Sequence, residues 1–128
     1  MLRHELAAPL VVAGLDHRDA GEGLITIGDR SALTLPREQD QMVADVAVLN
    51  PRTVVVLEGS GAMAMPWVDD VPAIVMAWYP GEEGGTAIAE VLFGDVNPSG
   101  KLPVTFPLAE TDLPPFDPVS LEVSYGYY

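Results

Sequence analysis

The sequence contains no cysteine, and this absence removes one class of chemistry. Without cysteine the chain forms no disulfide, and it has no thiolate to act as a nucleophile. The redox state of the compartment, and the compartment itself, therefore stay open. Histidine is scarce as well: His4 and His17 are the only two, and neither has the partner spacing of a metal-binding motif. The sequence predicts no metal site.

Basic residues are the second scarcity. Six Lys and Arg against nineteen Asp and Glu give a formal net charge of −13 over 128 residues. Such a charge repels nucleic acid and anionic membrane surfaces, so neither is expected as a partner. No apolar run approaches the roughly 20 residues that a membrane-spanning helix needs. A neutral substrate such as a sugar is unaffected by the charge.

The glycine motifs that bind nucleotides are missing too. There is no G-x-G-x-x-G, and no G-x-x-x-x-G-K-[ST] with its phosphate-contacting lysine. The stretch Gly81–Gly85 reads Gly-Glu-Glu-Gly-Gly, and a tight turn is favoured over an anion site because its two glutamates would repel a phosphate. Gly59–Gly61 lacks the G-x-S-x-G spacing of a hydrolase nucleophile elbow. No cofactor is predicted.

The chain does contain a succession of short apolar runs between turns and helical segments. Four runs are expected to be strands: Pro9–Leu15, Thr53–Leu57, Ala73–Trp78 and Val104–Phe106. β-Branched runs without alternation are typical of parallel strands covered on both faces. One helix is expected to begin near Pro36, with Met42 on its apolar face, and another to end at Gly94. The pattern predicts an α/β fold: an open, mainly parallel sheet with helices on both faces.

The expected domain organisation changes after Phe106. Residues 1–106 are predicted to form an incomplete α/β-sandwich domain, and residues 107–128 a proline-rich and aromatic extended tail. So few strands buried on both faces suggest an incomplete sheet, and Tyr125–Tyr128 is an unusual end for a free tail. We therefore expect the chain to be a piece of a longer protein.

Carboxylates are the remaining source of chemistry. In open α/β sheets, ligands bind beyond the carboxyl ends of the strands. The loops expected there are Asp16–Gly23, Glu58–Gly61 and Tyr79–Gly85. Glu22 lies between two glycines, so a ligand can approach it closely, and a glutamate so placed could act as a general acid. Spacing alone favours the plainer alternative, a solvated loop glutamate.

The most specific feature is Ala77–Pro107, which reads AWYPGEEGGTAIAEVLFGDVNPSGKLPVTFP. It strongly resembles the carboxyl-side α/β-sandwich domain of glycoside hydrolase family 3, the β-glucosidase and β-xylosidase group. The similarity continues upstream through Val54–Leu57. Gly21–Pro36 is similar to the family's loop that ends in an Asp-Arg pair. The resemblance runs from about Leu10 to Pro107, and it implies part of an α/β sandwich.

By resemblance, the expected activity is that of a retaining hydrolase of β-linked glucosides or related sugars. Retention needs two carboxyl groups about 5–5.5 Å apart. In the family the nucleophilic aspartate lies in a preceding (β/α)₈ barrel domain, for which this chain has no room. The acid/base glutamate often comes from a loop of the sandwich domain, and Glu22 matches its position. Asp29 and Arg30 match the neighbouring Asp-Arg pair, which we interpret as a structural brace.

Two functions are compatible with these features. The first is a β-glycosidase fragment that contributes the acid/base loop to a site shared with the missing barrel domain, and that is inactive alone. The alternative is a non-catalytic sugar-binding or interaction module. Trp67, Trp78 and Tyr79 could stack on a sugar in either case, although core packing is favoured for the two tryptophans.

Overall fold

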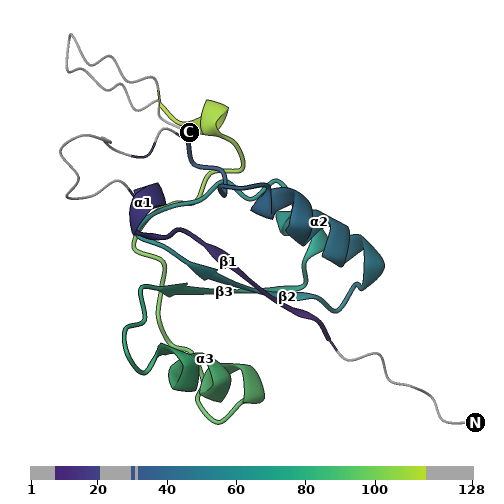
Figure 1. Ribbon diagram of the computed structural model, residues 1–128, viewed down its shortest axis with the longest axis vertical. Helices are drawn as coiled ribbons and strands as arrows, with labels where there is room; N and C mark the ends of the chain where they lie inside the picture. The colour runs from purple at the N-terminus through teal and green to yellow at the C-terminus, as the bar shows by residue number, and fades with distance from the viewer. Residues whose placement is uncertain (1–7, 21–29, 31, 115–128) are drawn as a thin grey trace, which may run out of the picture.

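The computed structural model describes residues 8–20, 30 and 32–114, and these residues form a three-layered α/β unit (Figure 1). A parallel sheet with the order β1-β2-β3 forms the middle layer. Its strands are β1 (Leu10–Gly14), β2 (Val54–Glu58) and β3 (Ala73–Trp78). Helix α2 (Gln39–Leu49) covers one face and α3 (Gly84–Phe93) lies over the other. The predicted fold class is confirmed.

Three shorter elements complete the described part. They are the four-residue helix α1 (His17–Ala20) and two 3₁₀ turns, η1 (Val68–Asp70) and η2 (Glu110–Asp112). Several predicted features lie outside the described residues, namely Glu22, Asp29 and the aromatic end of the tail. No helix in the described part is both long and apolar enough to cross a bilayer.

Strand β2 is the centre of the core. Val55, Val56 and Leu57 are fully buried, because the strand has a neighbour on each side and a helical layer on each face. A strand in this position has no solvent-facing side, and this explains its unbroken apolar run. Val43 and Ala47 of α2 are buried in the core cluster that includes Val55 and Leu57.

Helix α2 differs from its prediction at the amino end. It begins at Gln39 rather than near Pro36, because Arg37 and Glu38 have φ values of 56° and 59°, in the left-handed region. Pro36 therefore lies in a turn before the helix. The predicted apolar face is right for its two buried residues but wrong for Met42, which is 42% exposed.

The expected fourth strand, Val104–Phe106, does not form. Within the described residues the sheet has three strands, and Leu102–Phe106 contributes side chains beside β3 without ladder hydrogen bonds. Proline at position 103 has no backbone N–H to donate to a ladder, which disfavours a strand here. Phe106 instead packs edge-on against Trp78, with ring centroids 6.3 Å apart.

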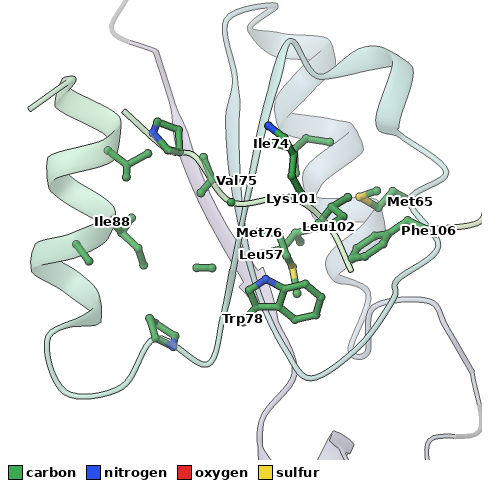
Figure 2. A pocket seen from close by; sticks show the side chains of 16 residues that line it. Leu57, Met65, Ile74, Val75, Met76, Trp78, Ile88, Lys101, Leu102 and Phe106 are labelled. Atoms are coloured by element: carbon green, nitrogen blue, oxygen red, sulfur yellow. The ribbon is translucent and has the colours of Figure 1, made fainter. Parts of the chain in front are cut away.

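The chain makes a tight, closely packed turn before α3, as the sequence predicted for Gly81–Gly85. Gly81 has a φ of 76°, and a Cβ added to Gly84 would lie 2.6 Å from the Pro80 ring. At the other end, Gly94 ends the helix in the left-handed conformation, with φ 83°. The apolar side of α3 faces β3 across a cavity of about 670 Å³, shown in Figure 2.

The division between residues 1–106 and 107–128 stays a prediction. Residues 107–114 do contact the rest of the unit, because the backbone N–H of Leu33 donates a hydrogen bond to the Glu110 carboxylate. The remaining residues of the predicted tail lie outside the described part of the chain.

Replacing Glu38 by glycine is expected to stabilise the protein. Glu38 has φ 59° and ψ 20°, and its side chain makes no capping hydrogen bond. Glycine adopts this conformation freely, whereas a Cβ costs about 1 kcal/mol. In urea titrations, Glu38→Gly should have a free energy of unfolding about 1 kcal/mol above that of the matched control Glu38→Ala. Equal stability of the two variants would contradict the left-handed conformation.

Candidate functional site

The carboxyl ends of all three strands meet at one edge of the sheet, where α1 also lies (Figure 1). Pairing continues just beyond the strands: the N–H of Leu15 donates to the carbonyl of Glu58 at 2.8 Å, and that of Gly59 to Trp78 at 3.0 Å. The segments that follow the strands are therefore neighbours. This edge is where open α/β sheets bind ligands.

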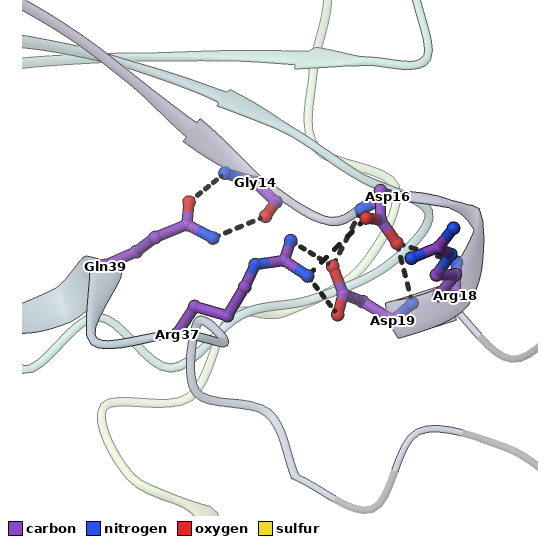
Figure 3. Close-up of polar contacts among 6 residues, drawn as sticks. All are labelled: Gly14, Asp16, Arg18, Asp19, Arg37 and Gln39. Atoms are coloured by element: carbon purple, nitrogen blue, oxygen red, sulfur yellow. Dashed lines mark hydrogen bonds and ion pairs between the residues drawn. The ribbon is translucent and has the colours of Figure 1, made fainter.

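Gln39 joins the beginning of α2 to the end of β1. Its Oε1 accepts a hydrogen bond from the N–H of Gly14 at 2.8 Å, and its Nε2 donates to the Gly14 carbonyl at 3.0 Å (Figure 3). Position 14 has no room for a side chain, because an added Cβ would lie 2.0 Å from the carbonyl oxygen of Glu58. No motif in the sequence marks Gln39, since this contact joins residues 25 positions apart.

Two aspartates and one arginine hold α1 against the sheet edge. The Asp16 carboxylate accepts the N–H groups of Arg18 and Asp19, and the Asp19 carboxylate accepts the N–H of Asp16, which closes the turn. Arg37 donates to Asp19 at 2.7 Å and lies 3.5 Å from Asp16 (Figure 3). The sequence indicated only a polar loop here, because the network depends on a long-range partner.

Asp16 is not suited to be the general acid of this edge. The backbone N–H of Arg18, followed by that of Asp19, holds the pKa of the Asp16 carboxyl below its ordinary value. Desolvation opposes this shift, and the charges of Arg37 and His17 add to it. The carboxyl is therefore ionised at neutral pH. A general acid must instead carry a proton at the working pH.

Arg30 ties the segment before α2 to the loop after β2. It donates to the backbone carbonyls of Ala32 at 2.9 Å, Leu33 at 2.7 Å and Ala62 at 3.0 Å. Burial lowers the pKa of the Arg30 guanidinium, and the charges of Glu110, Tyr79 and Asp19 oppose this shift. These contacts agree with a bracing role for Arg30. Its predicted partner Asp29 lies outside the described residues.

A hollow of about 420 Å³ opens at the same edge. Its lining consists of Leu15, Asp16, His17, Ala20 and Tyr79. Only this last residue among the three aromatic candidates borders the hollow: Trp67 is 2% exposed in the core, and Trp78 packs on Phe106. The Trp67 indole N–H donates to Asp40 at 2.7 Å, so its polar atom is also committed to the interior.

The described residues contain no group of three or more His, Cys, Asp or Glu side chains that could hold a metal ion. Among the loops expected at the edge, Ala20 is the last described residue before Glu22. The position of the Glu22 carboxyl therefore stays a prediction from the family resemblance.

Comparison with known proteins identifies the family. The family model described as "Glycosyl hydrolase family 3 C-terminal domain" matches residues 5–127. The chain belongs to glycoside hydrolase family 3. It is similar to a beta-glucosidase of Rhizobium radiobacter, with 46% identity over 80% of this chain and 12% of that protein. It is also similar to beta-glucosidase B of Emericella nidulans, with 54% identity over 67% of this chain and 10% of that protein.

Solved structures of family 3 relatives share the fold. The beta-glucosidase DesR from Streptomyces venezuelae, in complex with D-glucose, has a TM-score of 0.72 and 44% identity over 80% of this chain and 12% of that chain. The Kluyveromyces marxianus beta-glucosidase in complex with glucose has a TM-score of 0.71 and 39% identity, with the same coverage. The chain thus spans about an eighth of the length of these relatives and matches the family's C-terminal domain.

Gln39→Glu is expected to destabilise this edge. A carboxylate can accept the N–H of Gly14 but only repels its carbonyl, so the free energy of unfolding should fall by about 1–3 kcal/mol at neutral pH. Because the protonated acid is favoured in the folded state, the folded pKa of the new carboxyl is raised. The stabilisation from protonation is present below the unfolded pKa of about 4.3 and is lost as pH rises through the folded pKa.

The measurement is a set of urea titrations between acid and neutral pH. The difference in the free energy of unfolding between Gln39→Glu and the unmodified protein should become smaller as the pH is lowered. Gln41→Glu serves as a matched control: Gln41 is an exposed residue of α2 that donates only to Asp45 on the same helix, so a cost of a few tenths of a kcal/mol is expected. If the loss of unfolding free energy in Gln39→Glu did not change with pH, the hydrogen bond from the side chain at position 39 to the Gly14 carbonyl would not contribute to stability.

Proposed function

We propose that this chain is the acid/base-bearing part of a retaining β-glucosidase, and that a (β/α)₈ barrel domain outside it completes the site. The observation that carries the proposal is the match to the family 3 C-terminal domain over residues 5–127. The relatives named above are beta-glucosidases, and two of them are solved with glucose. A β-linked glucoside is accordingly the proposed substrate.

The geometry of the sheet edge supports Glu22 as the acid/base. Glu22 follows Ala20 by two residues, a span of at most about 7 Å of extended chain. Ala20 belongs to α1, which Arg37 and Asp19 tie to the edge. The loop that carries Glu22 therefore starts from an anchored point at the ligand-binding edge of the sheet.

In the proposed mechanism, the two carboxyl groups act from opposite sides of the scissile bond. The barrel's aspartate attacks the anomeric carbon and forms a glycosyl–enzyme ester, while the Glu22 carboxyl gives its proton to the departing glycosidic oxygen. In the second step the Glu22 carboxylate takes a proton from water, and the resulting hydroxide equivalent releases the sugar with retained configuration and frees the aspartate.

A non-catalytic sugar-binding module is the competing function. One observation favours it: the hollow beside Tyr79 combines an exposed aromatic residue with the polar side chains of Asp16 and His17. The two functions differ in what they require of Glu22. Only the glycosidase requires its proton.

The chain alone is expected to show no turnover of 4-nitrophenyl β-D-glucoside. It supplies the proposed acid/base carboxyl group but not the nucleophile, and a retaining mechanism needs both. Release of 4-nitrophenol by the purified chain is the measurement. Turnover that the Glu22→Gln substitution abolishes would overturn the division of the site between two domains.

Addition of a family 3 barrel domain in trans should restore hydrolysis with the unmodified chain but not with Glu22→Gln. For a poor leaving group such as phenol the loss should be about 10²–10⁴-fold, the range of general acid catalysis. The loss should be smaller for 2,4-dinitrophenol, which departs without protonation. Glu82→Gln is the matched control, since Glu82 is an exposed glutamate in the turn before α3. Equal rescue by Glu22→Gln would remove Glu22 from the mechanism.

A further inference from the structure

The hollow at the carboxyl edge is built from two different loops. Leu15 to Ala20 come from the segment after β1, and Tyr79 directly follows β3. Its volume of about 420 Å³ lies within the range of small-molecule sites, which is about 300–1,000 Å³. The lining combines apolar groups with the polar side chains of Asp16 and His17, and such a mixture is typical of small-molecule binding sites.

Tyr79 is exposed but firmly held. The residue is 53% exposed, while both of its chain neighbours are held in place. Trp78 has a φ of 57°, packs on Phe106 and accepts the N–H of Gly59 through its carbonyl. Pro80 has a fixed φ, and its ring packs on Gly84. A bulky residue in the left-handed region is strained, and such strain concentrates at functional positions.

The pairing of β3 explains why Tyr79 lies at the edge. The ladder between β2 and β3 shifts register between Leu57 and Glu58, so that Glu58 is opposite Trp78. The bulge and the positive φ of Trp78 redirect the chain where the strand ends, and a bulge commonly re-aims a side chain next to a site. Tyr79 then borders the hollow together with His17 and Ala20 of α1.

The charged side chains around the hollow bear on which ligands it can bind. Asp16 is one of its lining residues, its carboxyl is ionised at neutral pH, and the Asp19 carboxylate lies in the same turn. The chain as a whole carries −13. Arg37 pairs with both carboxylates and partly balances their charge. A neutral ring can pack on Tyr79 and hydrogen-bond to Asp16 or His17.

We infer that this hollow binds the leaving group of the substrate, and that a ring of the leaving group stacks on the side chain of Tyr79. The inference rests on the proposed function, because an acid/base residue protonates the oxygen on the leaving-group side of the scissile bond. The proposed function therefore assigns the surface beside Ala20, two residues before Glu22, to the leaving-group side. The class of leaving group is a neutral ring, aromatic or pyranose, with Tyr79 as a specificity-determining residue.

The kinetic test uses the chain together with the barrel domain. Tyr79→Ala should lower kcat/KM for phenyl β-D-glucoside by about 2- to 10-fold, the effect of one lost ring contact. It should leave β-D-glucosyl fluoride unchanged, because fluoride offers no ring to stack. Tyr79→Phe should keep most of the phenyl glucoside activity. Equal loss on both substrates, or no loss on either, would overturn the inference.

A binding test with the 128-residue chain alone separates this inference from the proposed function. In an NMR titration with phenyl β-D-glucoside, the ring signals of Tyr79 and His17 should shift, and Tyr79→Ala should remove the His17 shift. Phe93→Ala is the matched control, since Phe93 is an aromatic residue of α3 that is 85% exposed and does not line the hollow. These shifts, together with equal rescue by Glu22→Gln in the assay with the barrel domain, would reject the glycosidase proposal alone; absence of the shifts would reject stacking of the ligand ring on Tyr79.

Discussion

The contact between Gln39 and Gly14 is the constraint on which the candidate site at the sheet edge depends. One side-chain amide pairs with both backbone groups of Gly14, at 2.8 Å and 3.0 Å, while the missing side chain of Gly14 lets the Glu58 backbone approach. The end of β1 and the start of α2 thus become one unit. Because Arg37 precedes Gln39 by two residues, the same contact holds its guanidinium where it can reach Asp19.

The sequence predicted those elements in which successive residues share the same environment, so that the residue pattern is regular along the element. Ala73–Trp78 was predicted with its observed bounds, and the run in β2 was recognised because a strand buried on both faces stays apolar throughout. The errors arose where one position overrides the pattern. Position 103 is proline, so the apolar run around it lacks a ladder donor, and Glu38 has a positive φ that its side chain does not reveal.

The candidate site was less predictable, because its contacts join distant parts of the chain. The ion pair of Arg37 and Asp19 spans 18 residues, and no local motif announces either partner. Tyr79 stood out as an aromatic residue, but its place beside α1 depends on a bulge that only strand pairing defines. Glu22 came from family resemblance, since a glutamate between two glycines has no specific chemistry by itself.

The acidic character of the chain suits the role proposed for it. A general acid must hold its proton near neutral pH, and neighbouring negative charges raise the pKa of a carboxyl group by disfavouring its ionised form. A nucleophilic aspartate needs the opposite environment, because it must stay ionised. The proposed placement of the two carboxyl groups on different domains would let each domain set one pKa. In this chain the ion pair of Arg37 with Asp19 neutralises one carboxylate of the turn before Glu22, yet leaves the overall charge at −13. The turn at residues 16–19 is thus braced at the sheet edge of a strongly acidic chain, and a negative field favours the protonated form of a carboxyl group placed there.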